Sequence, residues 1–134
     1  QRPGVCNAIE TVLVHEKVAA SFISKLFDRI APKKVEWHAC PKTLEILKGK
    51  FGVVPAQPLH WDTEYLDAIV SVKIVSGLDE AIDFVNTHSS HHTDAIITAD
   101  NEAAAQFLNR IGSAIVMHNT STQFAVGGEF GLGA

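Results

Sequence analysis

The residue best suited to covalent chemistry is Cys6, which lies in the turn-like segment 2–8, just ahead of an apolar run. A thiolate is a strong nucleophile, and a cysteine at a turn can approach backbone N–H groups that lower its pKa and hold an oxyanion. No histidine stands close to Cys6 in the sequence to act as its base, although the fold could supply one. A small buried thiol is the alternative interpretation, and the local sequence alone favours that alternative.

The other cysteine and a cluster of histidines, which are residue types that can bind metals, are interpreted as structural. Cys40 is interpreted as a packing residue, and two cysteines are too few for a disulfide framework, which indicates free thiols in a reducing compartment. His88, His91 and His92 are close to Asp94 and could suggest zinc. Zinc needs a third or fourth ligand in a fixed geometry. A solvated or hydrogen-bonded turn is therefore favoured, and we expect no metal site.

Two polar segments could bind a small molecule. Glu64 comes just before an apolar strand and could accept hydrogen bonds from a ribose diol, although ordinary surface charge is favoured for the residue taken alone. Residues 119–123 are five consecutive polar side chains after another apolar run. They could line a pocket for a carboxylate or ammonium group, and a capping loop is an equally good interpretation. The glycine-rich run 127–133 contains no GxGxxG motif between a strand and a helix, so it does not support a dinucleotide fingerprint.

Strands and helices that would position these residues alternate along the first half of the chain. The apolar, β-branched run 11–15 predicts a buried strand. Apolar residues then recur every three to four positions over 16–31, which predicts an amphipathic helix that stops at Pro32. The face of this helix comprises Val18, Ala19, Phe22, Ile23, Leu26, Phe27 and Ile30. After it we expect a strand at 35–39, a short helix at 41–48 and a long surface loop at 49–62.

The second half repeats the same unit. Residues 68–75 predict a strand, and Ser76 with Asp79 resembles a capping box. The helix that follows would bury Leu78, Ala81, Ile82 and Val85. The next unit comprises a strand at 94–99, a helix capped by Asp100 with Ala104, Phe107, Leu108 and Ile111 on one face, and a strand at 113–118. This alternation predicts an α/β fold of three layers, in which a mostly parallel sheet is flanked by helices on both faces.

Composition limits the class of protein. The chain has 134 residues, a formal net charge of −4, 46% hydrophobic residues and 19% charged residues. These values are typical of one globular domain and exclude a disordered or low-complexity chain. Mild acidity and only three arginines argue against a nucleic-acid partner. No stretch approaches the roughly 18 apolar residues needed to cross a membrane, and the N-terminal residues lack the layout of a signal peptide.

Five segments in order resemble one family, the gamma-glutamyl phosphate reductases (glutamate-5-semialdehyde dehydrogenases) of the aldehyde dehydrogenase superfamily. The resemblance covers essentially the whole chain and is weakest between residues 41 and 60. Several motifs in the same order are more specific than any one of them. The segments are 2–11 (RPGVCNAIET), 61–67 (WDTEYLD), 90–94 (SHHTD), 119–124 (NTSTQF) and 128–134 (GEFGLGA).

The resemblance implies that Cys6 is the catalytic nucleophile. Its thiolate would attack the acyl phosphate of gamma-glutamyl phosphate and expel phosphate, leaving a thioester. Hydride from NADPH would then release glutamate-5-semialdehyde on the route to proline. By the superfamily pattern, Glu64 would bind the ribose next to the nicotinamide, and Leu66 would lie near the ring.

The resemblance also implies that the loop 119–124 holds the glutamate end of the substrate. Its expected substrate-binding residues are Asn119, Ser121, Thr122, Gln123 and Phe124, with Ser121 and Thr122 the best candidates to meet charged groups. Gln123 stands where many relatives carry arginine, a departure that affects any charge contact with an anionic substrate there.

The family pattern further implies that residues 1–134 are a catalytic domain without its NADPH-binding domain and C-terminal segment. The cofactor-binding half of the family, which also supplies an oxyanion-stabilising asparagine, precedes the cysteine. We therefore expect the isolated chain neither to bind NADPH tightly nor to turn over, and the parent enzyme to be a cytoplasmic homo-oligomer.

Two alternatives stay open at this stage. One is an acylating aldehyde dehydrogenase that uses a coenzyme A thioester, and a short polar loop at 119–124 argues for a small amino-acid substrate instead. The other is a non-catalytic α/β interaction module in which Cys6 is merely buried. Slow, burial-limited alkylation of Cys6 without substrate protection would favour the module.

Overall fold

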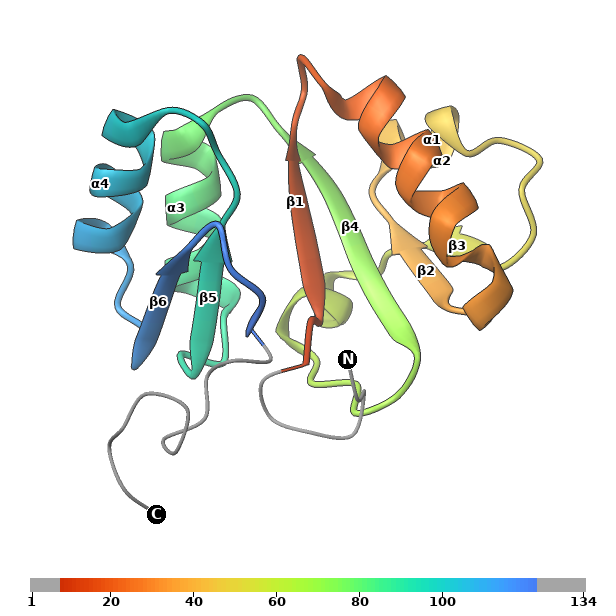
Figure 1. Ribbon diagram of the computed structural model, residues 1–134. Helices are drawn as coiled ribbons and strands as arrows, with labels where there is room; N and C mark the ends of the chain where they lie inside the picture. The colour runs from red at the N-terminus through yellow and green to blue at the C-terminus, as the bar shows by residue number, and fades with distance from the viewer. Residues whose placement is uncertain (1–7, 123–134) are drawn as a thin grey trace.

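The structure is a computed structural model that describes residues 8–122 (Figure 1). Short strands and helices alternate along this part of the chain. In order they are β1 (Thr11–His15), α1 (Ala19–Ile30), η1 (Ala31–Lys33), β2 (Glu36–Ala39), α2 (Pro41–Ile46), β3 (Val53–Pro55), η2 (Pro58–Asp62), β4 (Ile69–Val75), α3 (Leu78–His88), β5 (Thr93–Ile96), α4 (Asn101–Arg110) and β6 (Ile115–His118).

The strands form two parallel sheets. One has the order β1-β4-β2-β3, and the other pairs β5 with β6. In the larger sheet, His38 of β2 stands opposite Ser71 of β4 in the ladder. Figure 1 shows the two sheets beside each other, with β1 and β5 at their facing edges. The expected parallel α/β fold is confirmed, but β1 and β5 are not paired, so the described strands do not form one continuous sheet.

Side chains of β4 alternate between two layers of covering elements. Val72 is fully buried in the same apolar cluster as Ile23 of α1 and Leu47 at the end of α2. Lys73 points the other way, and its Nζ lies 5.8 Å from the ring centroid of Trp61 in η2. Because successive strand residues point to opposite faces, α1 and α2 cover one face of β4, and η2 covers the other. This arrangement gives the three layers expected from the sequence.

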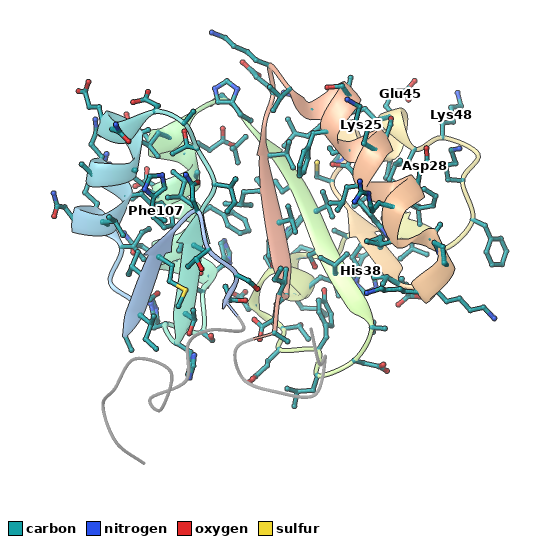
Figure 2. The ribbon with its side chains drawn as sticks, in the orientation of Figure 1. Lys25, Asp28, His38, Glu45, Lys48 and Phe107 are labelled. Carbon is teal, nitrogen blue, oxygen red and sulfur yellow. The ribbon has the colours of Figure 1, made fainter. Side chains whose placement is uncertain are left out.

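A second apolar cluster lies between the smaller sheet and the helices α3 and α4. Ile82 of α3, Phe107 of α4 and Ile111 are its buried members. Phe107, labelled in Figure 2, projects from α4 toward this cluster. Partly buried residues of α3, β5 and β6 pack around them, namely Leu78, Val85, Ile96 and Val116. The predicted buried faces of α3 and α4 are therefore largely confirmed, except that Leu108 is 42% exposed.

The prediction of a long loop at 49–62 was wrong, because this segment contains β3 and η2. β3 pairs with β2, with Val53 opposite Trp37. η2 begins with Gln57 as its N-cap, and the Gln57 and His60 side chains form a reciprocal capping box. Gly52 has φ = 82°, which only glycine adopts readily and which turns the chain into β3. Strand pairing with a distant segment overrode the local glycine and proline signals.

Two helix starts also differ from the sequence prediction. α1 begins at Ala19, and Val18 and Phe22 of its predicted buried face are 52% and 45% exposed. Before α3, Gly77 is the N-cap, and the backbone N–H and hydroxyl of Ser76 both donate to Glu80 Oε2 at 2.7 Å. The acidic partner of Ser76 is therefore Glu80, one residue beyond the predicted one.

Asp100 caps α4 as predicted, and its removal should be measurable. Its Oδ1 accepts hydrogen bonds from the N–H groups of Glu102 and Ala103 at 2.9 and 3.1 Å. Asp100→Ala should lower the free energy of unfolding by about 1 kcal/mol, since two helix-terminal N–H groups lose their partner. Urea unfolding measures the change. Asp83→Ala, at an exposed position on α3, is the control and should change stability by less than about 0.5 kcal/mol. Equal losses in both variants would contradict the capping role.

Candidate active site

A cavity of about 820 Å³ lies between the two sheets. Residues 8–15 of the β1 segment and 93–97 of the β5 segment line it from opposite sides. The exposed Val18, just before α1, and Phe22 of α1 line it as well, which explains why the predicted apolar face is wider than the buried stripe of α1. Residues 119–122 also line the cavity, so this predicted substrate loop meets the strand that follows Cys6.

Glu10 is a half-buried carboxyl group in the wall of this cavity. Its backbone carbonyl accepts a hydrogen bond from the N–H of Ser71 at 2.9 Å, which fixes the segment before β1 against β4. Burial raises the pKa of Glu10 to about 7, and the charges of Glu64 and Asp94 add to the increase. Glu10 can therefore exchange a proton near neutral pH, a property suited to acid or base chemistry.

Asp94 is held in place by two serine hydroxyls. Ser89 Oγ donates to Asp94 Oδ2 at 2.6 Å, and Ser113 Oγ donates to the same oxygen. These bonds connect the end of α3, β5 and the start of β6 around one carboxylate. Asp94 also lines the cavity. Because both serine hydroxyls bond its carboxylate, the side chain is held in one position in the cavity wall.

Asn119, Ser121 and Thr122, which the sequence predicts as substrate-binding residues, all line the cavity. Asn119 has φ = 55°, and its side-chain oxygen and nitrogen bond the N–H and carbonyl of Thr98 at 2.9 and 3.0 Å. Its amide thus braces the turn after β6 against the end of β5. Ser121 and Thr122 follow directly from this fixed turn.

Glu64 and Leu66 are not among the residues that line the cavity. Both side chains are exposed. Glu64 is nevertheless close enough for its charge to raise the pKa of Glu10. An exposed carboxylate can accept hydrogen bonds from both hydroxyls of a ribose, which is the property that the predicted cofactor-binding role of Glu64 requires.

Three expected site residues, Cys6, Gln123 and Phe124, lie outside the described residues. No role is predicted from the sequence for Glu10 or Tyr65, although both lie inside the segments that carry the family resemblance. Glu10 comes four positions after Cys6, at the start of an apolar strand. A lone acidic residue at such a strand entrance is the signal that could have identified it.

Residues 88–92, which contain three histidines, form a hydrogen-bonded turn at the end of α3. His88 Nδ1 bonds Asp62 Oδ1 at 2.7 Å, and the backbone N–H of His91 donates to Ser89 Oγ at 3.0 Å. Within residues 8–122, no group of three or more His, Cys, Asp or Glu side chains is arranged to hold a metal ion. In the same range, no helix is long and apolar enough to cross a membrane.

The raised pKa of Glu10 predicts a pH-dependent stability. The folded protein keeps a proton on Glu10 up to about pH 7, whereas an ordinary glutamate releases it near 4.5. The contribution of the protonated Glu10 carboxyl group to the free energy of unfolding is therefore complete below pH 4.5 and is lost as the pH rises through about 7. Glu10→Gln should raise the melting temperature more at pH 8 than at pH 5. Glu45→Gln, on the exposed face of α2, should give no such difference, and equal shifts at both pH values for Glu10→Gln would contradict the assignment.

The parallel arrangement with helices on both faces is the aldehyde dehydrogenase-like α/β fold. The crystal structure of an acetylating aldehyde dehydrogenase from Geobacillus thermoglucosidasius superposes with a TM-score of 0.68 over 96% of this chain and 36% of that chain, at 14% identity. That likeness defines the fold alone. The sequence matches no family model.

Relatives and solved structures of one name are similar to this chain along its whole length. A gamma-glutamyl phosphate reductase from Thermus thermophilus is 50% identical over all 134 residues, and one from Mesorhizobium japonicum is 49% identical. The crystal structure of gamma-glutamyl phosphate reductase from Thermotoga maritima superposes over the whole chain with a TM-score of 0.95 and 43% identity. The chain is thus homologous to gamma-glutamyl phosphate reductases along its whole length, as the resemblance predicted, and spans 31–32% of theirs.

Proposed function

We propose that this chain is the nucleophile-bearing domain of an NADPH-dependent gamma-glutamyl phosphate reductase. The reaction converts gamma-glutamyl phosphate to glutamate-5-semialdehyde and phosphate, a step of proline biosynthesis. The observation that carries the proposal is the identity of about 50% to reductases of this name over the whole chain. The cavity supports it, because the strand after Cys6 and the polar loop 119–122 line the same space.

The chemistry begins with the Cys6 thiolate. It attacks the acyl carbon of gamma-glutamyl phosphate, a carbon–sulfur bond forms, and the carbon–oxygen bond to phosphate breaks to release phosphate. NADPH, when bound, would supply the hydride that reduces the resulting thioester. The carbon–sulfur bond then breaks, which releases glutamate-5-semialdehyde and regenerates the Cys6 thiolate. Ser121 and Thr122 bind the charged glutamate end from the fixed turn at Asn119, and Gln123 and Phe124 extend this loop.

Glu64 and Leu66 bind the cofactor in this proposal. The exposed Glu64 carboxylate accepts the ribose hydroxyls, and the 54% exposed Leu66 offers an apolar surface to the nicotinamide ring. The phosphates and adenine would be bound by a separate domain of the complete enzyme. We therefore expect the isolated chain to bind NADPH weakly.

The proposed complete enzyme is a cytoplasmic homo-oligomer about three times the length of this chain, as the relatives' length indicates. Among the described strands, β1 and β5 border the cavity and each has one unpaired edge, whose backbone N–H and C=O groups the remaining parts of the enzyme can pair with or cover. Exposed strand edges are normally covered in native proteins.

The proposal is tested by assaying the complete enzyme in the oxidative direction, with glutamate-5-semialdehyde and NADP⁺. NADPH formation should depend on inorganic phosphate, and the isolated 134-residue chain should give none. Acyl-enzyme trapping should place a glutamyl group on Cys6. Activity that required coenzyme A in place of phosphate would contradict the proposal and support an acylating aldehyde dehydrogenase.

A further inference from the structure

The side chain of Tyr65 points away from its neighbours Glu64 and Leu66 and into the sheet. Its Oη lies 2.5 Å from Ser71 Oγ and 3.1 Å from the backbone carbonyl of His60. Ser71 is fully buried on β4, one of the two inner strands of the larger sheet. Tyr65 therefore connects an irregular segment directly to a buried position of the larger sheet.

A third contact joins Tyr65 to β2. Tyr65 Oη is 3.1 Å from Nδ1 of His38, the buried residue labelled on β2 in Figure 2. The other ring nitrogen of His38 is 3.0 Å from Glu36 Oε2, and the His38 ring packs on the His60 ring with centroids 4.0 Å apart. Burial raises the pKa of Tyr65, so its phenol stays protonated and can donate a hydrogen bond at neutral pH.

The residues on either side of Tyr65 are held in a specific and exposed geometry. Leu66 has φ = 53°, a left-handed conformation that a leucine rarely adopts and that surrounding structure must enforce. After it, the N–H of Ala68 donates to Asp67 Oδ1 at 2.7 Å, which leads the chain into β4. Tyr65 and Asp67 thus fix the segment at both sides of Leu66, while Glu64 and Leu66 remain exposed.

We propose that Tyr65 is a positioning residue, which holds Glu64 and Leu66 in the conformation that receives the ribose and nicotinamide through its hydrogen bonds to Ser71, His60 and His38. This inference rests on the proposed function, because it assigns Glu64 and Leu66 to the cofactor. Tyr65 does not touch the cofactor in this arrangement, since its hydroxyl is bonded inside the sheet.

The test compares Tyr65→Phe, Ser71→Ala and the double variant in the complete enzyme. Each single variant should raise the KM for NADPH about three- to tenfold, the effect expected for one lost hydrogen bond, with a smaller change in the KM for the acyl substrate. The double variant should be no worse than the poorer single variant, because both changes remove the same anchor.

Thr43→Val is the matched control. Thr43 is fully buried, and its hydroxyl donates to the carbonyl of Val72, the residue after Ser71 on β4, at 3.4 Å. It lies on the α2 side of the sheet, so its loss should lower the melting temperature without changing the KM for NADPH. An equal rise in KM in this control would show that Tyr65 has only a general structural role and would overturn the inference.

Hydrogen exchange, which needs no bound cofactor, provides a second test of the role of Tyr65. Hydrogen exchange at residues 64–67 should accelerate in Tyr65→Phe and Ser71→Ala, while exchange in β5 stays unchanged. If the variant enzymes were active and showed both an unchanged KM for NADPH and unchanged hydrogen exchange, the inference about Tyr65 would be overturned and the proposed function would stand. A wild-type enzyme without phosphate-dependent activity would instead overturn the proposed function.

Discussion

Replacing Cys6 by serine in the complete reductase should lower kcat by at least about 10³-fold, because the serine hydroxyl is a far weaker nucleophile than a thiolate. Phosphate-dependent reduction of NADP⁺ by glutamate-5-semialdehyde measures the loss. Glutamyl trapping on residue 6 should disappear in the same variant. The KM for NADP⁺ should change little, since Cys6 is not among the residues proposed to bind the cofactor.

The matched control is the other cysteine. Cys40 is 5% exposed, and Cys40→Ala should keep kcat within a few-fold of the wild-type value. Burial raises the pKa of the Cys40 thiol, but hydrogen bonds from Thr43 and from the N–H of Ile74 outweigh it, and the net pKa is lowered. The Cys40 thiol therefore ionises more readily than a free thiol, but it is buried. If Cys6→Ser kept full activity, Cys6 would be a packing residue and the proposed mechanism would be wrong.

Local signals explain which parts of the fold the sequence predicts well. The run 11–15 forms β1 with the predicted bounds, because consecutive β-branched and apolar residues suit a buried parallel strand. Asp100 caps α4 because an aspartate needs only the next few N–H groups to make its bonds. β3 has only three residues and depends on pairing with Trp37 and its neighbours in β2, which no local pattern reveals.

The same distinction applies to the candidate site. Asn119, Ser121 and Thr122 could be found because their polarity contrasts with the apolar strand before them. The raised pKa of Glu10 depends on burial and on the charges of Glu64 and Asp94, and one of the contacts that hold Tyr65 is with His38, all of which are distant in the sequence. Properties that depend on distant neighbours become visible only in the folded chain.

Trp37→Ala should lower the free energy of unfolding by about 3–5 kcal/mol, which exceeds any other single change considered for stability. Trp37 is 1% exposed, packs on Phe27 of α1 with ring centroids 5.4 Å apart, and stands opposite Val53 and Val70 in the two neighbouring ladders. Truncation would leave a cavity shared by α1 and three strands, which backbone relaxation cannot fill. Urea unfolding measures the loss, with Trp37→Phe as a milder control.

Trp37 and His38 are adjacent on β2 and point to opposite faces of the sheet. Trp37 belongs to the apolar cluster with α1, whereas His38 bonds Tyr65 on the other side. Trp37→Ala should therefore lower stability without raising the KM for NADPH at temperatures where the variant is folded, and Tyr65→Phe should raise that KM at a much smaller loss of stability. If stability and the KM for NADPH changed together in both Trp37→Ala and Tyr65→Phe, the two faces of the sheet would be one cooperative unit. The conformation of residues 64–66 would then depend only on the general stability of the sheet.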